Sequence, residues 1–216
     1  RFREHFLDTF VPINLSARPT TLIESELFGH RRGAFTGADA DRSGYLEGLR
    51  EDHSVFLDEI GDLDGAIQVK LLRVLETRRF QRVGEVAPRT FGGKIIAATN
   101  RDLDREVEAG RFRADLYYRL CSDVVTTPSL AELVRDDPEE LRGLVTLLAR
   151  RLVDPGDLEP LVDEVHAFVE ENLGPAYPWP GNVRELEQCV RNILIRGTYR
   201  PLHAGAGAGL GALVES

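Results

Sequence analysis

The sequence predicts an α/β domain built on a parallel sheet, followed by a small helical subdomain. Short apolar runs recur through the first 130 residues and are separated by helical patterns, and an acidic stretch with helical periodicity follows over 131–175. A length of 216 residues suffices for one large domain or for one domain with a small companion. Apolar runs of only a few residues are too short to cross a membrane, so we expect no membrane contact.

Four apolar runs are predicted to be buried strands, at 10–13, 54–57, 95–98 and 124–125. Between the second and third runs, apolar residues at helical spacing predict a helix over 66–75. The first three runs end in polar residues, which are Asn14, Asp58 with Glu59, and Thr99 with Asn100. Ligands of α/β proteins bind at the carboxyl ends of the strands, so these residues form a candidate site.

The stretch 131–175 holds 12 acidic and 4 basic side chains around apolar positions at helical spacing. This pattern predicts amphipathic helices with a solvated acidic face. The rigid turn 178–181 precedes a further helix, for which Asn182 and Glu185 are the expected N-cap and N3 pair. The net charge of −9 argues against non-specific binding of nucleic acid by the whole chain.

Two cysteines, Cys121 and Cys189, are too few for a disulfide framework and indicate a reducing compartment. We expect both to be small core residues. The five histidines have no spacing suited to zinc.

Asp58 and Glu59 follow an apolar strand directly, as in a Walker B element. In such an element the aspartate holds Mg²⁺, usually through water, and the glutamate orients the attacking water. Ordinary loop residues that cap a helix at Leu63 would have the same sequence, and this segment alone does not decide between the two.

The segment Gly33–Ala38, with the sequence GAFTGA, has glycines that allow a sharp, open loop around one aromatic residue. An exposed Phe35 on such a loop would be a contact for another molecule. The alternative is a turn whose Phe35 folds back into the core.

Several motifs in order resemble the AAA+ domain of bacterial sigma-54-dependent transcriptional activators. They cover most of residues 7–196 and read ESELFGH at 24–30, GAFTGA at 33–38, FLDEIGDL at 56–63, QVKLLRVLE at 68–76, ATN at 98–100, GRFRADLYYRL at 110–120 and WPGNVREL at 179–186. The resemblance implies an AAA+ parallel sheet flanked by helices over 1–132, a helical lid over 133–200 and a flexible tail over 201–216.

The resemblance also implies the roles of individual residues. Asp58 and Glu59 match the Walker B pair, with Asp58 on Mg²⁺, and Asn14 matches the residue that restrains the catalytic glutamate. Thr99 and Asn100 match sensor I, and Arg184 matches sensor II. Arg113 and Arg119 match arginines that reach the neighbouring subunit's nucleotide, where a guanidinium stabilises charge on the transferring phosphoryl group. The loop tip, Phe35 and Thr36 within Gly33, Ala34, Phe35, Thr36, Gly37 and Ala38, matches the contact with sigma-54.

A cytoplasmic transcription regulator is therefore expected, with ATP and Mg²⁺ as cofactors. It would form a homo-oligomeric ring, expected to be a hexamer, and remodel the closed complex of the sigma-54 RNA polymerase holoenzyme. Promoter DNA would be contacted only indirectly.

The largest departure from the family is that the sequence contains no P-loop of the form GxxxxGK followed by Ser or Thr, and a smaller one is the stretch 131–137, where the family usually has an Arg-rich entry to the lid. Two explanations are open. The chain is a fragment, which the absence of methionine and the retained site residues favour, or it is a degenerate relative that binds sigma-54 or AAA+ rings without hydrolysing ATP. Under either explanation we expect this polypeptide alone to hydrolyse ATP poorly or not at all.

Overall fold

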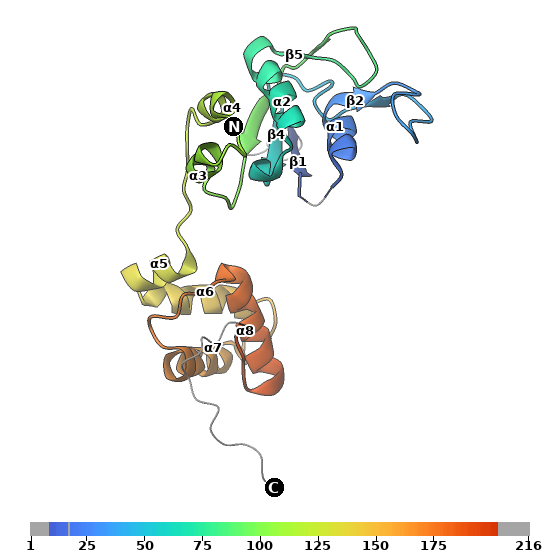
Figure 1. The fold of residues 1–216 in the computed structure, drawn as a ribbon. Coiled ribbons are helices and arrows are strands. Elements are labelled where there is room, and N and C mark those ends of the chain that lie inside the picture. Colours follow the sequence, from blue (N-terminus) through green and yellow to red (C-terminus); the bar gives the residue numbers. More distant parts are fainter. Residues whose placement is uncertain (1–8, 17, 203–216) are drawn as a thin grey trace. The chain divides into compact units, whose positions relative to one another are not determined.

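A computed structural model describes residues 9–16 and 18–202 of the chain (Figure 1). The chain divides into two compact units, residues 1–124 and 125–216. The division falls before the boundary expected from the sequence, after residue 132, because helix α5 begins at Leu130 and packs within the second unit. The expected tail lies almost wholly outside the described residues.

A parallel sheet forms the centre of the first unit, with the strand order β1-β4-β7. These strands are β1 (Phe10–Asn14), β4 (Ser54–Asp58) and β7 (Lys94–Ala97), so the first three runs are confirmed as strands. Their expected burial holds for β4 only, because most residues of β1 and β7 are exposed or half-buried. The fourth prediction is wrong. Val124 and Val125 lie after α4 in a segment without regular secondary structure, and 64% and 85% of their surface is exposed. Their short apolar run therefore forms no strand.

Helices and two small hairpin-like pairs surround this sheet in the described part of the first unit (Figure 1). The helices are α1 (Thr20–Phe28), the 3₁₀ turn η2 (Ile60–Asp62), α2 (Gly65–Thr77), α3 (Leu103–Glu108) and α4 (Ala114–Leu120). The antiparallel pairs are β2 (Gly29–His30) with β3 (Arg42–Ser43), and β5 (Arg79–Phe80) with β6 (Arg89–Thr90).

Helix α2 is the helix expected over 66–75, extended at both ends. Its start is capped by Asp64, whose carboxylate accepts a hydrogen bond from the Ala66 amide at 2.8 Å. Its apolar face, with Ile67 and Leu71, shares one hydrophobic core with Leu57 of β4 and Leu116 of α4. Burial of this core fixes the sheet and thereby the positions of its strand ends.

The second unit is helical throughout its regular, described elements, which confirms the helices predicted over 131–175. They are α5 (Leu130–Asp136), α6 (Glu139–Ala149), α7 (Leu158–Phe168), its π-helical continuation η3 (Val169–Leu173) and α8 (Asn182–Arg196). Val145, Val162 and Leu186 are fully buried at the centre of this unit.

The start of α8 differs from the expected N-cap arrangement. Asn182 has a left-handed backbone (φ 50°), and its side-chain oxygen accepts a hydrogen bond from the Leu130 amide of α5 at 2.8 Å. Gly181 is the N-cap, and its amide donates to Glu185 Oε2 at 2.8 Å. The other oxygen of Glu185 accepts from the Tyr177 and Tyr199 hydroxyls at 2.5 and 3.2 Å. Asn182 therefore serves a tertiary contact instead of capping its own helix, whereas Glu185 still bonds the N-cap amide and also holds the two tyrosines.

The two cysteines differ in environment. Cys189 is fully buried among the apolar residues of the second unit, as expected, and burial raises the pKa of its thiol to about 12. Cys121 is only partly buried at the end of α4, so the expectation of a core residue fits it less well.

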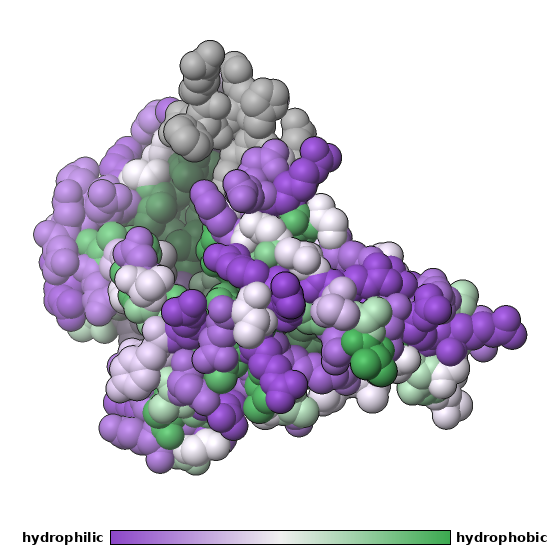
Figure 2. Space-filling model, turned by 90° about the horizontal axis from the view of Figure 1, so that it is seen from above, coloured by the Kyte–Doolittle hydropathy of each residue, from purple (hydrophilic) through white to green (hydrophobic). Residues whose placement is uncertain are grey.

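Hydrophilic side chains cover most of the molecular face seen in Figure 2. Among the residues with assigned positions, none of the helices combines the length and apolar character needed to span a membrane.

Candidate functional site

The polar residues predicted at the strand ends do gather at one edge of the sheet. We call Asn14, Asp58, Glu59, Thr99 and Asn100 the strand-end site. Asn14 and Asp58 are register partners in the β1–β4 pair, and Leu57 is opposite Ala97 in the β4–β7 pair. Parallel pairing therefore brings together residues that are far apart in the sequence.

Asp58 lies at the centre of the strand-end site and is half-buried. Its Oδ2 accepts a hydrogen bond from Asn14 Nδ2 at 3.3 Å, and its Oδ1 accepts one from the Glu59 amide at 3.2 Å. The side-chain oxygen of Asn14 accepts from the amide and hydroxyl of Ser16 at 2.9 and 2.6 Å. These bonds fix the Asn14 amide on Asp58, whereas the resemblance pairs Asn14 with the neighbouring Glu59.

Glu59 has a left-handed backbone, with φ 59° and ψ 46°. For a residue with a side chain this conformation costs free energy, on the order of 1 kcal/mol, and such residues cluster at functional sites. The turn directs the carboxylate toward the end of β7, where Glu59 Oε2 accepts from the Asn100 amide at 3.5 Å. The chain thus bends sharply to bring the second acidic residue next to Asn100.

Thr99 completes this edge. Its hydroxyl accepts a hydrogen bond from the Arg101 amide at 3.1 Å. A Cβ added at Gly61 would lie 2.8 Å from the Thr99 hydroxyl, so only glycine lets the turn after β4 approach the end of β7 this closely.

The strand-end site has the chemistry of a partial magnesium site. In residues 9–16 and 18–202, no group of three or more acidic, histidine or cysteine side chains converges as a metal cage. Mg²⁺ does not require such a cage, because it keeps several waters and takes one or two carboxylates together with substrate phosphates. Asp58, half-exposed and with polar neighbours, fits that pattern.

Arg113 directly precedes α4 and Arg119 lies within it, and both residues are exposed. Arg113 forms a two-point ion pair with Asp115, at 3.0 and 2.7 Å, which lowers the pKa of the Asp115 carboxyl. Arg119 donates to the Leu75 carbonyl at 3.4 Å. Both guanidiniums are accessible from outside the unit.

Gln68 is a buried polar residue beside Arg113 that the sequence analysis did not single out. Its side chain is fully buried and donates to the Leu63 and Arg111 carbonyls at 2.8 and 3.0 Å. Its oxygen accepts from the Arg113 amide at 2.8 Å, which ties the start of α4 to α2. The available signal was a glutamine on the apolar face of the predicted helix, three positions before Leu71.

The segment 31–41 connects β2 and β3 and projects from the first unit (Figure 1). Gly33 and Gly37 have positive φ angles of 80° and 97°, as the open loop requires. The Gly33 amide donates to the Ala38 carbonyl at 2.8 Å, so the GAFTGA residues close on themselves.

Phe35 is neither freely exposed nor buried in the core. It is half-buried, and its ring meets the edge of the His30 imidazole with centroids 5.0 Å apart. His30 Nδ1 is in turn hydrogen-bonded to the Ser25 hydroxyl at 2.7 Å. Neither of the two alternatives from the sequence therefore describes Phe35 fully, because its ring packs against the His30 imidazole at the base of its own loop.

Arg184 is exposed in the first turn of α8 in the second unit. Its expected role as sensor II remains a prediction.

The parallel sheet, the acidic turn after β4 and the projecting glycine loop together define an AAA+-type α/β unit, which a helical unit follows in the chain. The chain belongs to the family described as the Sigma-54 interaction domain, which matches residues 3–126.

Curated relatives are bacterial regulators. The chain is 44% identical to the regulatory protein LuxO of Vibrio cholerae over 190 residues, covering 88% of this chain and 34% of LuxO. It is 45% identical to the Nif-specific regulatory protein of Azotobacter vinelandii over 186 residues, covering 86% and 34%. The transcriptional regulator NtrC of Rhizobium meliloti is 44% identical over 186 residues, covering 85% and 36%. The chain therefore spans about a third of the length of these relatives.

Solved structures of NtrX from Brucella abortus have a similar fold. One superposes with a TM-score of 0.65 at 28% identity, covering 86% of this chain and 40% of that chain. NtrX in complex with ATP matches with a TM-score of 0.63 at 27% identity, covering 86% and 38%. A further NtrX structure contains ADP.

Proposed function

We propose that this chain is the sigma-54-contacting and nucleotide-responsive module of a transcriptional activator. In this proposal Asp58 holds Mg²⁺ of a bound ATP, Glu59 orients the attacking water, and the GAFTGA loop binds sigma-54. The module works in a homo-oligomeric ring, in which Arg113 and Arg119 reach the nucleotide of the adjacent subunit. It remodels the closed complex of sigma-54 RNA polymerase.

The observation that carries the proposal is that one compact unit contains both features. The strand-end site has a carboxylate suited to Mg²⁺ beside a strained glutamate, and the projecting loop presents a half-exposed aromatic residue. Nucleotide binding is supported by the NtrX complexes with ADP and ATP, and the sigma-54 contact is supported by the family match. No Walker A sequence occurs in the 216 residues. In this proposal the chain therefore supplies the residues that hold Mg²⁺ and orient the attacking water.

The sigma-54 contact can be tested with the chain itself. We expect purified chain to bind immobilised sigma-54 in an interferometry experiment, and Phe35→Ala to weaken that binding about 10-fold or more, since a buried aromatic anchor dominates an interface. Leu147→Ala is the matched control, because Leu147 is an exposed apolar residue (52%) in the second unit. Equal affinity of Phe35→Ala and the unchanged chain would contradict the loop assignment.

A sigma-54-binding module without ATP hydrolysis is the second candidate, favoured by the absence of a GxxxxGK run. A titration with Mg²⁺–ATP followed by calorimetry separates the two. Saturable binding that Asp58→Asn weakens and Glu76→Gln leaves unchanged favours the nucleotide-responsive module, since Glu76 is an exposed acid on α2. Retained sigma-54 binding with no ATP binding by the chain favours the second candidate.

A further inference from the structure

Two loops of the first unit touch at the base of the GAFTGA loop. The Arg31 amide donates to the Val83 carbonyl at 3.0 Å, and the Val83 amide donates to the Gly29 carbonyl at 2.9 Å. A Cβ added at Gly84 would lie 2.9 Å from the Ala34 Cβ. The segment 81–88, which connects β5 to β6, therefore packs directly on the GAFTGA loop.

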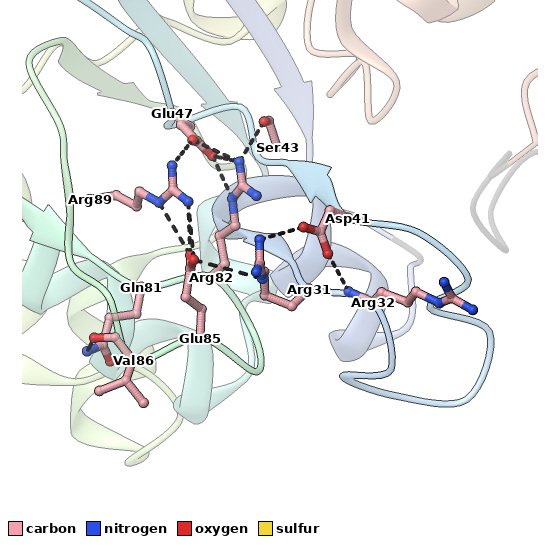
Figure 3. Close-up of polar contacts among 10 residues, drawn as sticks. All are labelled: Arg31, Arg32, Asp41, Ser43, Glu47, Gln81, Arg82, Glu85, Val86 and Arg89. Carbon is pink, nitrogen blue, oxygen red and sulfur yellow. Dashed lines mark hydrogen bonds and ion pairs between the residues drawn. The ribbon is translucent and has the colours of Figure 1, made fainter.

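An alternating chain of charges reinforces this contact (Figure 3). Arg31 forms an ion pair with Asp41 at 2.5 Å and lies 3.9 Å from the Glu85 carboxylate. Glu85 also accepts hydrogen bonds from Arg89 at 3.2 and 3.3 Å. Arg89 also forms an ion pair with Glu47 at 2.6 Å. Glu85 thus adds a side-chain link between the base of the GAFTGA loop and the β5–β6 segment to the backbone bonds through Val83.

The inner members of this chain are shielded from water, and the outer members are not. The side chains of Glu85 and Glu47 are 14% and 19% exposed, whereas those of Arg31 and Asp41 are 49% and 45% exposed. Arg82, at 10% exposure, completes the inner part by pairing with Glu47 at 2.8 Å. Shielded pairs are screened less by salt, and removal of one partner leaves the other charge uncompensated.

The charges in this group are balanced. Arg31, Arg82 and Arg89 face Asp41, Glu47 and Glu85, so loss of the Glu85 charge would leave one excess positive charge between Arg31 and Arg89. Repulsion would then act between the GAFTGA base and the β5–β6 segment, where attraction acts now.

We infer that Glu85 is a positioning residue that holds the GAFTGA loop against the β5–β6 segment and so sets the direction in which Phe35 is presented. The inference rests on the proposed function for its biological meaning. The positioning itself is a property of the free chain and can be measured without sigma-54.

The test is hydrogen exchange of the free chain, measured by mass spectrometry on peptides covering 33–38. We expect Glu85→Gln to raise the exchange rate there about 5-fold, because the loop loses its ion pair with the β5–β6 segment while the backbone bonds through Val83 remain. Peptides covering β4 should not change, which shows that the unit remains folded. Glu76→Gln, at an exposed acid of the same unit, is the matched control.

Arg31→Gln breaks the same link from the loop side and should raise exchange at 33–38 by a similar factor. Combined with Glu85→Gln, it should add less than its effect alone, because both variants remove the Arg31–Glu85 pair, although Arg31→Gln also removes the pair with Asp41. Unchanged exchange at 33–38 in Glu85→Gln, or fully additive effects in the double variant, would overturn the inference. If exchange rises while sigma-54 binding is absent in every variant, the positioning holds and the proposed function fails.

Discussion

The strand-end site and the GAFTGA loop are held in place by different forces. Asp58 ends a strand whose Val55 and Leu57 are completely buried, and its position follows from backbone pairing on both sides. The base of the GAFTGA loop is held by backbone hydrogen bonds to Val83 and by ion pairs that include the half-exposed Arg31 and Asp41. The first arrangement depends on the core, and the second depends in part on charge, so different perturbations should affect them.

The largest expected effect comes from the core under the strand-end site. Leu57→Ala removes a fully buried side chain beside Asp58, and it should lower the free energy of unfolding by about 2–5 kcal/mol. Urea unfolding followed by far-UV circular dichroism measures this change. Leu147→Ala, at a half-exposed residue of the second unit, should cost less than about 0.5 kcal/mol. A similar cost for both variants would contradict the assignment of β4 to the core.

This contrast explains which parts could be predicted from the sequence. Short apolar runs made β1, β4 and β7 predictable as strands, although only β4 is largely buried, and parallel pairing then placed Asn14 beside Asp58. Val124 and Val125 show the limit of that rule, because a two-residue apolar run carries no information about whether a sheet partner exists.

Side-chain geometry was less predictable. The left-handed backbone of Glu59 and the contact of Phe35 with His30 depend on close tertiary packing, which local sequence does not predict. The ion pairs of Glu85 with Arg31 and with Arg89 join residues from separate segments, and only the folded chain brings them together. Asn182 was assigned to its own helix because nothing in the local sequence indicates the Leu130 amide from which its side chain accepts a hydrogen bond.

Gln68 offers a second, smaller test, on a polar group inside the core. Gln68→Leu keeps the side chain buried but leaves the Arg113 amide and the Leu63 and Arg111 carbonyls without their partner. Unpaired buried polar groups are costly, so the free energy of unfolding should fall by about 2–3 kcal/mol. Gln188→Leu, at an exposed position of α8, is the matched control and should have little effect. Stability equal to that of the unchanged chain would show that Gln68 does not hold α4 to α2.

The smallest expected effect concerns a single proton at the base of the GAFTGA loop. The Arg32 amide donates to Asp41 at 2.8 Å, and this bond, together with the nearby Arg31 charge, lowers the pKa of Asp41 from its ordinary value of 3.8. Because the folded-state pKa is lowered, the bond contributes its full stabilisation above pH 3.8 and loses it as the pH falls through the folded value. A carbon-detected NMR titration of the Asp41 carboxyl should therefore have its midpoint below 3.8.

Arg31→Gln separates the two causes of that shift. It removes the charge but keeps the Arg32 amide, which is the larger cause, so the Asp41 midpoint should rise and still stay below 3.8. A midpoint that reaches 3.8 in Arg31→Gln would mean that the Arg31 charge alone lowers the pKa of Asp41 and that the Arg32 amide adds nothing to the shift. The contact of Asp41 with the base of the loop would then be electrostatic, and its difference from the strand-end site would be sharper than the hydrogen bonds indicate.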